Sequence, residues 1–465
     1  MTAGSAVLCC IFTSFAVHYG WRMRGTVIGG EKGAMLPGLL AGLVISQFAG
    51  DSISKLFFIP AAAGLIGMSY GGIEPYGDSI SLVMDKRAVE PNPKKGLAGL
   101  ALKGALWFSI AGGYIGFSFS AMGSKYSVGD IIAFCILVPI AQLAGYRIFN
   151  QPYDPENGKL PKIYLSYESR DEWGSNVGVL FVILLFAIIR KDVPALSMCL
   201  CGLVFGAVGW LVAMRLYYYT EHRMKNGKYL LGVFSEKGLV GGWSNMEFCL
   251  GSFGGFGLAL GFVLARKSIG EINAKISTEG VFSPISNNIG IYIFMAVLFI
   301  ALLVINVYEY RCDRDDRYYN SFIMDCIERP FFNTLPYAAV LMCSVPAAKL
   351  MTVFMLLYVL LIKCSFDRLK PGTARKVFIA VGGLICLAAA VCCVLINGFE
   401  TYWLLAALIA GTVPYILSEL YWCIATNRHG GWECLSSLNG FSFGILLMTA
   451  DSAVIIVVAY LLKIR

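Results

Sequence analysis

The chain has little charge for its length. Of its 465 residues, 57% are hydrophobic and only 14% are Asp, Glu, Lys or Arg, and the mean hydropathy is +0.69. Soluble domains carry roughly a quarter of charged residues. A chain with so few polar side chains cannot cover a water-facing surface with them. This excludes a soluble globular protein and predicts a polytopic membrane protein.

The chain also lacks the usual patterns of metal sites and disulfide frameworks. Its 3 His lie far apart in sequence, and its 15 Cys form no C-x-x-C pair and fall mostly inside apolar runs. Such Cys serve as small core residues. We therefore expect no metal and no cofactor. The Lys and Arg lie in short loops rather than along one basic face, which argues against nucleic acid as a partner.

Long apolar runs are abundant. About fourteen of them approach the length needed to cross a hydrocarbon core about 30 Å thick. We predict an all-α, polytopic integral membrane helix bundle of about 12–14 transmembrane helices, forming a single transmembrane domain over residues 1–465. The predicted spans are 5–21, 34–50, 56–72, 97–121, 128–145, 174–189, 194–214, 246–265, 289–308, 335–348, 350–362, 377–396, 401–424 and 440–462.

The loop charges favour one orientation of these spans. If every run crosses and the N-terminus faces outward, most of the Lys and Arg fall in loops on one side. Positively charged loops remain in the cytoplasm. We therefore predict a multi-pass protein of the plasma (inner) membrane. Merging 335–348 and 350–362 into one crossing would move a basic cluster outside, so two crossings are favoured.

Four predicted helix starts combine Trp, an acidic residue and G-x-x-x-G spacing. They are "WRMRGTVIGGEKGAMLPGLLAG" (21–42), "DEWGSNVG" (171–178), "WSNMEFCLGSFGG" (243–255) and "GGWECLSSLNGFSFG" (430–444). The first, third and fourth belong to spans that are six apart. This spacing predicts parallel internal repeats of about six helices, with half-repeats 1–193 and 194–465.

These helix starts have two interpretations. In one, the acid complements the helix dipole, Trp lies at the interface and the glycines allow close helix packing. In the other, glycine-rich helix starts and nearby charges bind an ion or solute, as broken helices do in transporters. The first interpretation is favoured for the four helix starts as a group, while the first helix start supports the second, because it mixes charges of both signs with glycines.

Charged side chains at membrane depth are costly and usually face a cavity or a partner. Lys103 lies inside a predicted span, although it could instead extend its amine to the cytoplasmic interface. Glu419 and Asp451 also lie inside spans and are the candidates for ion coupling. The candidate substrate path consists of Arg22, Arg24, Glu31, Lys32, Lys103, Trp243 and Glu247.

Transport is favoured over catalysis. We predict a secondary, proton- or Na⁺-coupled transporter of a small polar or anionic solute, with membrane lipids as its other partners. The alternative is a membrane-embedded transferase that acts on a lipid or lipid-linked substrate at the cytoplasmic face. For Mg²⁺ it could use Asp313, Asp315 and Asp316, but these alternate with arginines, which is typical of a salt-bridged loop. For acyl transfer, neither His18 nor His429 has an obvious nucleophile arrangement beside it.

Overall fold

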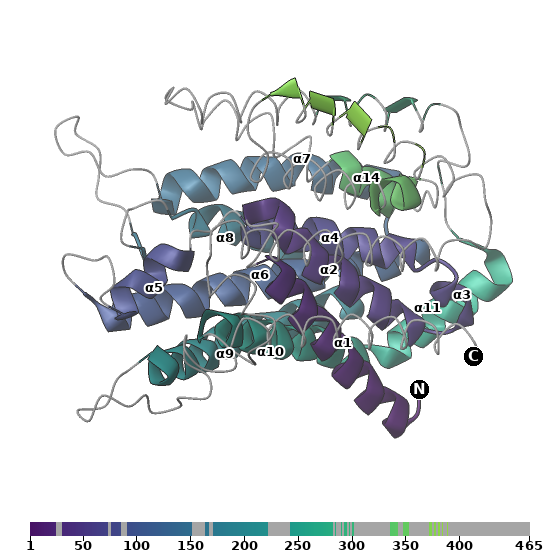
Figure 1. The fold of residues 1–465 in the computed structure, drawn as a ribbon. Helices are drawn as coiled ribbons and strands as arrows, with labels where there is room; N and C mark the ends of the chain where they lie inside the picture. Colours follow the sequence, from purple (N-terminus) through teal and green to yellow (C-terminus); the bar gives the residue numbers. More distant parts are fainter. Residues whose placement is uncertain are drawn as a thin grey trace.

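The fold is entirely helical where it is described. In the computed structural model, the described residues are 1–24, 30–72, 76–84, 91–150, 163–166, 171–221 and 242–281, with short stretches beyond them, chiefly 335–342 and 347–352. These residues form 13 helices, one of them a π-helical turn (Figure 1). They are α1 (Ala3–Met23), α2 (Gly30–Gln47), α3 (Asp51–Ser54), α4 (Phe58–Gly72), α5 (Tyr76–Met84), α6 (Pro93–Met122), α7 (Val128–Gly145), η2 (Tyr146–Asn150), α8 (Trp173–Ile189), α9 (Val193–Glu221), α10 (Gly242–Leu264), α11 (Arg266–Glu279) and α14 (Leu335–Leu341).

Five of these helices are long and apolar enough to cross a membrane. They are α1, α6, α7 together with η2, α9 and α10. The first eight predicted spans each coincide with a helix, and their ends agree within a few residues except for the longer C-terminal end of α9. The prediction of an all-α bundle is therefore confirmed for the described residues. Most of the later spans lie outside them, so the total of 12–14 crossings and the half-repeats 1–193 and 194–465 stay predictions.

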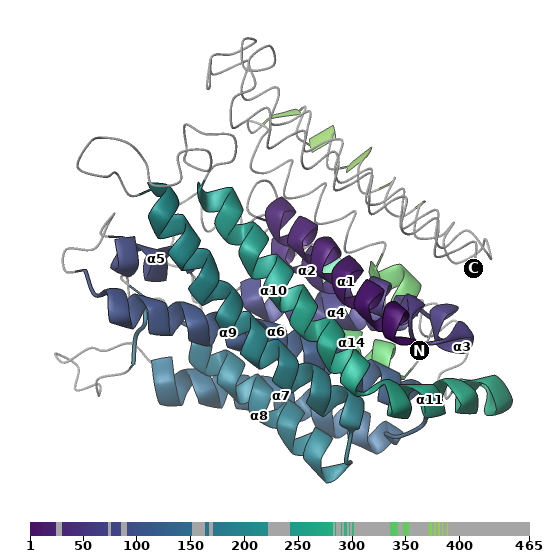
Figure 2. The same ribbon diagram turned by 90° about the horizontal axis from the view of Figure 1, so that it is seen from below.

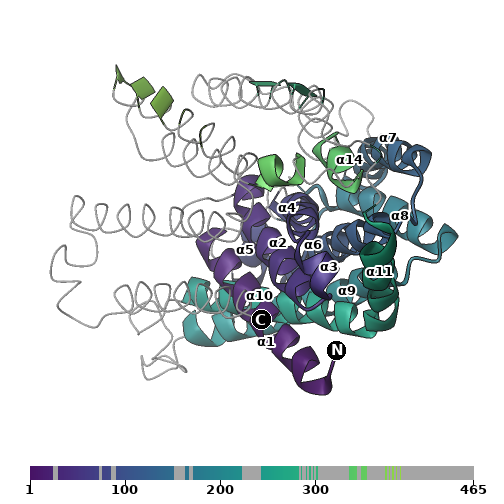
Figure 3. The ribbon, with the colours of Figure 1, turned by 90° about the vertical axis from the view of Figure 1, so that its right-hand side faces the viewer.

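Helix α6 forms the centre of the bundle. Of its most apolar stretch 89% is buried, against 33% for α7. It packs against α4, α5, α8 and α9, and the end-on view in Figure 3 shows it between α4 and α9. Helices α9, α10 and α1 run side by side along another face (Figure 2). Residues near the middle of α6 are thus surrounded by protein rather than by lipid.

The G-x-x-x-G glycines of three predicted helix starts lie at helix–helix contacts. A Cβ on Gly38 of α2 would overlap the carbonyl oxygen of Gly64 in α4. One on Gly178 of α8 would overlap Ala141 in α7, and one on Gly251 of α10 would meet the backbone of α1. The packing interpretation is therefore confirmed for these glycines. The fourth helix start, 430–444, lies outside the described residues.

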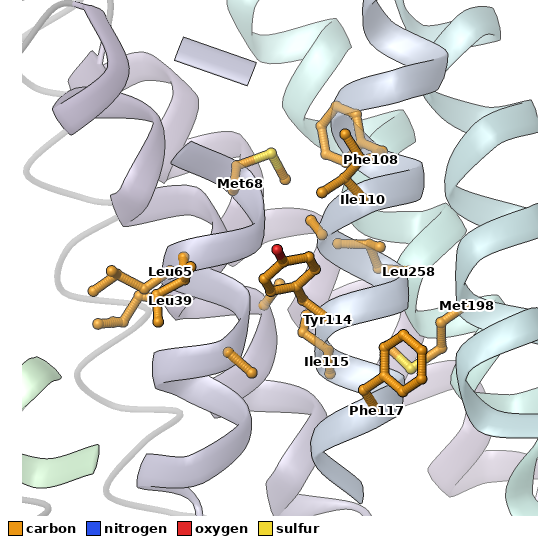
Figure 4. Packing of buried hydrophobic residues seen from close by; sticks show 14 of the residues in the cluster. Leu39, Leu65, Met68, Phe108, Ile110, Tyr114, Ile115, Phe117, Met198 and Leu258 are labelled. Atoms are coloured by element: carbon orange, nitrogen blue, oxygen red, sulfur yellow. The ribbon is translucent and has the colours of Figure 1, made fainter. Parts of the chain in front are cut away.

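An apolar core joins the helices near the middle of α6. Figure 4 shows Tyr114 of α6 between Leu65 of α4 and Leu258 of α10. The Tyr114 hydroxyl lies 3.0 Å from that of Tyr70, and its backbone carbonyl accepts a 2.8 Å hydrogen bond from the Tyr337 hydroxyl. The tyrosine contacts satisfy polar groups that would otherwise be buried without partners. They also attach α14 to the N-terminal part of the bundle.

Two of the helices that lie outside the predicted spans, α5 and α11, pack at opposite ends of α6. The nine-residue α5 packs along the N-terminal part of α6. Helix α11 lies near the C-terminal end, where Lys275 donates a 3.1 Å hydrogen bond to the Gly123 carbonyl. Its Asn273 accepts from the backbone N–H groups of Ser52 and Ile53, both at 3.1 Å, and so caps α3. Each end of the bundle is therefore covered by a short helix.

Candidate functional site

A buried ion pair lies near the N-terminal end of α6. The Lys103 amine is fully buried and donates to Asp171 Oδ1 at 2.7 Å and to the Ser79 hydroxyl of α5 at 2.9 Å. We call Ser79, Lys103 and Asp171 the Lys103 cluster. The amine makes these contacts deep inside the protein, so the interpretation that it reaches the membrane interface is wrong.

The Lys103 cluster also holds a segment of chain that is distant in sequence. The other Asp171 carboxylate oxygen accepts a hydrogen bond from the Leu165 backbone N–H. The Leu165 carbonyl accepts a 2.8 Å hydrogen bond from Ser79. Two hydrogen bonds therefore attach residues 163–166 to the same end of the bundle as α5, and both are made by residues of the Lys103 cluster.

A second group of charged residues lies beside the first. Arg24, the C-cap residue of α1, is buried, and its guanidinium carbon lies 4.7 Å from the ring centroid of Tyr76. The Tyr76 hydroxyl donates to Glu247 Oε1 of α10 at 3.2 Å. Burial raises the pKa of Tyr76 above its ordinary range, so the phenol keeps the proton that it donates. One tyrosine thus contacts a buried cation and a buried anion.

Three tryptophans complete this second group. Trp21 stacks on Trp107 of α6 at a centroid distance of 5.4 Å, and Trp107 meets Trp210 of α9 edge-on at 5.8 Å. Tyr76 contacts both Trp107 and Trp210, and Arg24 lies 5.1 Å from the Trp21 ring. We call this group the Arg24 cluster; its members are Trp21, Arg24, Tyr76, Trp107, Trp210 and Glu247.

Four buried donor atoms of the Arg24 cluster have no hydrogen-bond partner within the described part of the chain. They are Arg24 Nε and the indole nitrogens of Trp21, Trp107 and Trp210. Each residue is at most 4% exposed. A buried donor without an acceptor costs about 1–3 kcal/mol, so native proteins rarely bury several together.

Helices α5 and α6 connect the two clusters. Tyr76 and Ser79 lie three residues apart on α5, and Lys103 and Trp107 lie four residues apart on α6. Residues at these spacings share one face of a helix. Side chains from α1, α5, α6, α9 and α10 therefore meet in one polar region inside the bundle.

The structure brings three of the predicted substrate-path residues into this region: Arg24, Lys103 and Glu247. The backbones of Arg22, Glu31, Lys32 and Trp243 lie in α1, α2 and α10, but their side chains are outside the described part. Glu419 and Asp451 also lie outside it. For all nine predicted site residues the assignment to a substrate path or to ion coupling stays a prediction.

Sequence reasoning missed the acid that pairs with Lys103. The second predicted helix start drew attention to Glu172, but this residue is the N-cap of α8 and its side chain makes no capping hydrogen bond. The partner is its neighbour Asp171. The four-residue spacing of Lys103 and Trp107 could have indicated that both side chains lie in the same polar region, because residues at that spacing share one face of a helix. Nothing in the sequence indicates that α5 supplies Tyr76 and Ser79 to the polar region, since this stretch predicts only a turn or a short interfacial helix.

Another buried acid lies near the C-terminal end of α6. Asp192 precedes α9 and accepts hydrogen bonds from the Ser120 and Tyr126 hydroxyls, both at 2.7 Å, and from the Ala195 N–H at 2.9 Å. Burial raises the pKa of this carboxyl. All three donors are neutral, and no basic side chain of the described residues forms an ion pair with it.

By helix length and hydropathy the chain is a multi-pass membrane protein with a buried polar region in its bundle. Within the described residues, no group of three or more His, Cys, Asp and Glu side chains is placed to hold a metal ion. No protein family model, curated protein or solved structure matches the chain.

Proposed function

We propose that the protein is a secondary transporter of the plasma (inner) membrane that moves a small polar or anionic solute. One observation carries the proposal. Arg24, Lys103, Asp171 and Glu247 are all buried in a bundle of membrane-crossing helices, and they gather at two adjacent clusters.

The energetic cost of such charges supports a functional role. A charged side chain inside a membrane costs several kcal/mol and is retained where it pairs or lines a solute path. Lys103 and Asp171 compensate one another directly. Arg24 instead lies against aromatic rings and keeps an unpartnered Nε among the described residues. This incomplete pairing distinguishes the Arg24 cluster from an ion pair that only holds helices together.

The position of the clusters agrees with a solute path. The Arg24 cluster lies between α1, α5, α6, α9 and α10, which come from separate parts of the chain, so a small relative movement of these helices would change the contacts of Arg24. Both clusters lie toward the N-terminal end of α6, the predicted cytoplasmic side. Glu419 and Asp451 remain the proposed residues for coupling to a proton or Na⁺.

The test is solute flux into proteoliposomes. Purified protein is reconstituted, and uptake of labelled carboxylates, phosphate and neutral polar solutes is measured under imposed proton and Na⁺ gradients. We expect gradient-dependent uptake of one solute class, a loss of at least about 10-fold in Arg24→Gln and Glu247→Gln, and no change in Lys267→Gln, whose side chain is exposed on α11. Glu419→Gln and Asp451→Asn should lose the response to the coupling ion.

The same preparation separates transport from catalysis. A transferase acting on a lipid-linked substrate would form product in detergent without any gradient, whereas a transporter would not. Wild-type flux with unchanged Arg24→Gln and Glu247→Gln variants would contradict the proposed path.

A further inference from the structure

We propose that the Arg24 cluster binds a small oxyanion, held by the Arg24 guanidinium and the indole N–H groups of Trp21, Trp107 and Trp210. The inference names the solute class and therefore rests on the proposed function. It starts from the four donor atoms that have no hydrogen-bond partner in the described part of the chain.

The donors and acceptors of the cluster are unequal in number. Trp and Arg side chains have donors only, and no lone pair that could accept a hydrogen bond. Within the cluster Glu247 offers a carboxylate, and one of its oxygens accepts the Tyr76 hydroxyl. A ligand that only accepts hydrogen bonds would satisfy the remaining N–H groups. A cation or a donor-rich solute would leave them unpaired and would meet the charge of Arg24.

The chemistry of the donors favours an oxyanion over a halide. A guanidinium presents parallel N–H groups that match two oxygens of a carboxylate or phosphate. The indole groups supply further donors from three helices, since Trp21 shares α1 with Arg24 while Trp107 and Trp210 belong to α6 and α9. The rings of Tyr76, Trp107 and Trp210 contact one another at centroid distances of 5.2–6.0 Å. The bound group is therefore compact.

Contacts between the aromatic rings are a competing explanation for the indole N–H groups that have no hydrogen-bond partner among the described residues. An edge-on indole can direct its N–H at a neighbouring ring face, and Trp107 meets Trp210 at an interplanar angle of 70°. Such N–H···π contacts are second-order interactions, and they contribute less than a hydrogen bond to a charged oxygen. They also involve no ion, so the two explanations differ in a measurable way.

The experiment measures oxyanion binding by purified protein in a phosphate-free maltoside detergent. Inorganic phosphate, acetate or sulfate is added at constant ionic strength with chloride as the balancing ion. Intrinsic tryptophan fluorescence and the melting temperature are recorded, since three of the 8 Trp lie in the cluster. We expect one oxyanion to change both signals with a saturating concentration dependence, beyond the effect of chloride.

The variants remove single donors. Trp107→Phe and Trp210→Phe keep a ring but remove one N–H each, and each should weaken binding by about 10-fold. Arg24→Gln should abolish binding, and Arg24→Lys should restore part of it through charge alone. Trp173→Phe is the matched control, because the buried Trp173 of α8 also has an unpartnered indole nitrogen among the described residues but packs on Phe149, away from Arg24.

Three results would overturn the inference. They are no response to any oxyanion beyond that of chloride, Arg24→Gln binding like the wild type, or Trp173→Phe weakening binding as much as Trp107→Phe. Binding without flux in proteoliposomes would contradict transport and leave the oxyanion site standing. Flux with an unchanged concentration dependence in Trp107→Phe and Trp210→Phe would contradict the site and leave transport standing.

A further titration identifies the source of the oxyanion. A short-chain phosphatidic acid in detergent carries the same phosphate on acyl chains. Equal apparent affinity for inorganic phosphate and this lipid would identify the oxyanion itself as the ligand. Binding of the lipid alone would place a headgroup in the Arg24 cluster and favour the lipid-linked substrate.

Discussion

At the scale of single residues, the Lys103–Asp171 ion pair makes the protein sensitive to the loss of either partner. Lys103→Met leaves the buried Asp171 carboxylate without its cation, and Asp171→Leu removes the carboxylate that contacts the buried amine. Breaking a buried pair from one side costs about 3–5 kcal/mol, whereas replacing both partners by apolar residues is often nearly neutral. We therefore expect a large fall in melting temperature in each single variant, measured in detergent.

The double variant Lys103→Met/Asp171→Leu provides the control. It should recover most of the lost thermal stability, because neither charge remains buried. Additive losses in the double variant would mean that the two side chains stabilise the bundle independently of one another.

The buried Asp192 carboxyl should make the stability of the protein depend on pH. Since burial raises its pKa, the folded protein binds this proton more tightly than the unfolded chain does. Its contribution to the free energy of unfolding is full below the ordinary Asp pKa of about 4 and is lost as pH rises through the raised pKa. Asp192→Asn should remove this dependence. The stability of wild type relative to the variant, followed by chemical unfolding, should therefore fall with rising pH across that window.

An unchanged pH profile in Asp192→Asn would contradict this prediction. Tyr126→Phe is a useful companion variant, because it removes one 2.7 Å donor to the carboxylate and leaves the ring in place. Loss of that donor should raise the pKa of Asp192 further and move the window to higher pH.

The sequence could identify buried charges but could not pair them. Lys103 and Glu247 were recognisable because each interrupts an apolar run, and both are buried. The partner of Lys103 was not recognisable, because Asp171 lies 68 positions away and beside an equally plausible Glu172. Pairing depends on how α6 and the start of α8 meet, which a single sequence does not specify.

At the scale of helices, the close glycine contacts predict that small substitutions will have unequal effects. Gly38→Ala places a methyl group against the Gly64 carbonyl, so α2 and α4 must separate. Such overpacking costs about 1–3 kcal/mol. Gly270→Ala on α11 meets nothing within 4 Å and should be neutral or stabilise by up to about 1 kcal/mol. Melting temperatures of the two variants compare these effects directly, and equal stability would contradict the close approach.

The positions of the long apolar helices could be predicted from the sequence, whereas those of the short helices could not. The run 128–145 matches α7 because apolar length alone marks a crossing helix, and Ser127 with Asp130 forms a capping box that specifies where it begins. Helix α11 has no such length or hydropathy. It depends on contacts with Gly123 and α3 that exist only in the folded chain.

At the scale of the whole molecule, the bundle predicts which surfaces face each side of the membrane. Lys94 lies at the start of α6, and Lys267 lies on α11 near the other end; both are exposed. The 30 residues of α6 span about 45 Å. A membrane-impermeant maleimide should label Lys267→Cys in intact cells and Lys94→Cys only after permeabilisation. Labelling of both from one side would contradict the crossing of α6, and the reverse pattern would contradict the predicted orientation.

Helix α5 links the interior of the bundle to its surface mechanically. Its Tyr76 contacts the Arg24 cluster, and its Ser79, one turn later, contacts both Lys103 and the Leu165 carbonyl. Because Tyr76 and Ser79 lie on one helix of 9 residues, a movement of that helix would change the contacts of both side chains. Binding of a ligand at the Arg24 cluster would therefore change the hydrogen bond from Ser79 to Leu165. In this way α5 would couple a buried ligand to residues 163–166 at the predicted cytoplasmic end of the bundle.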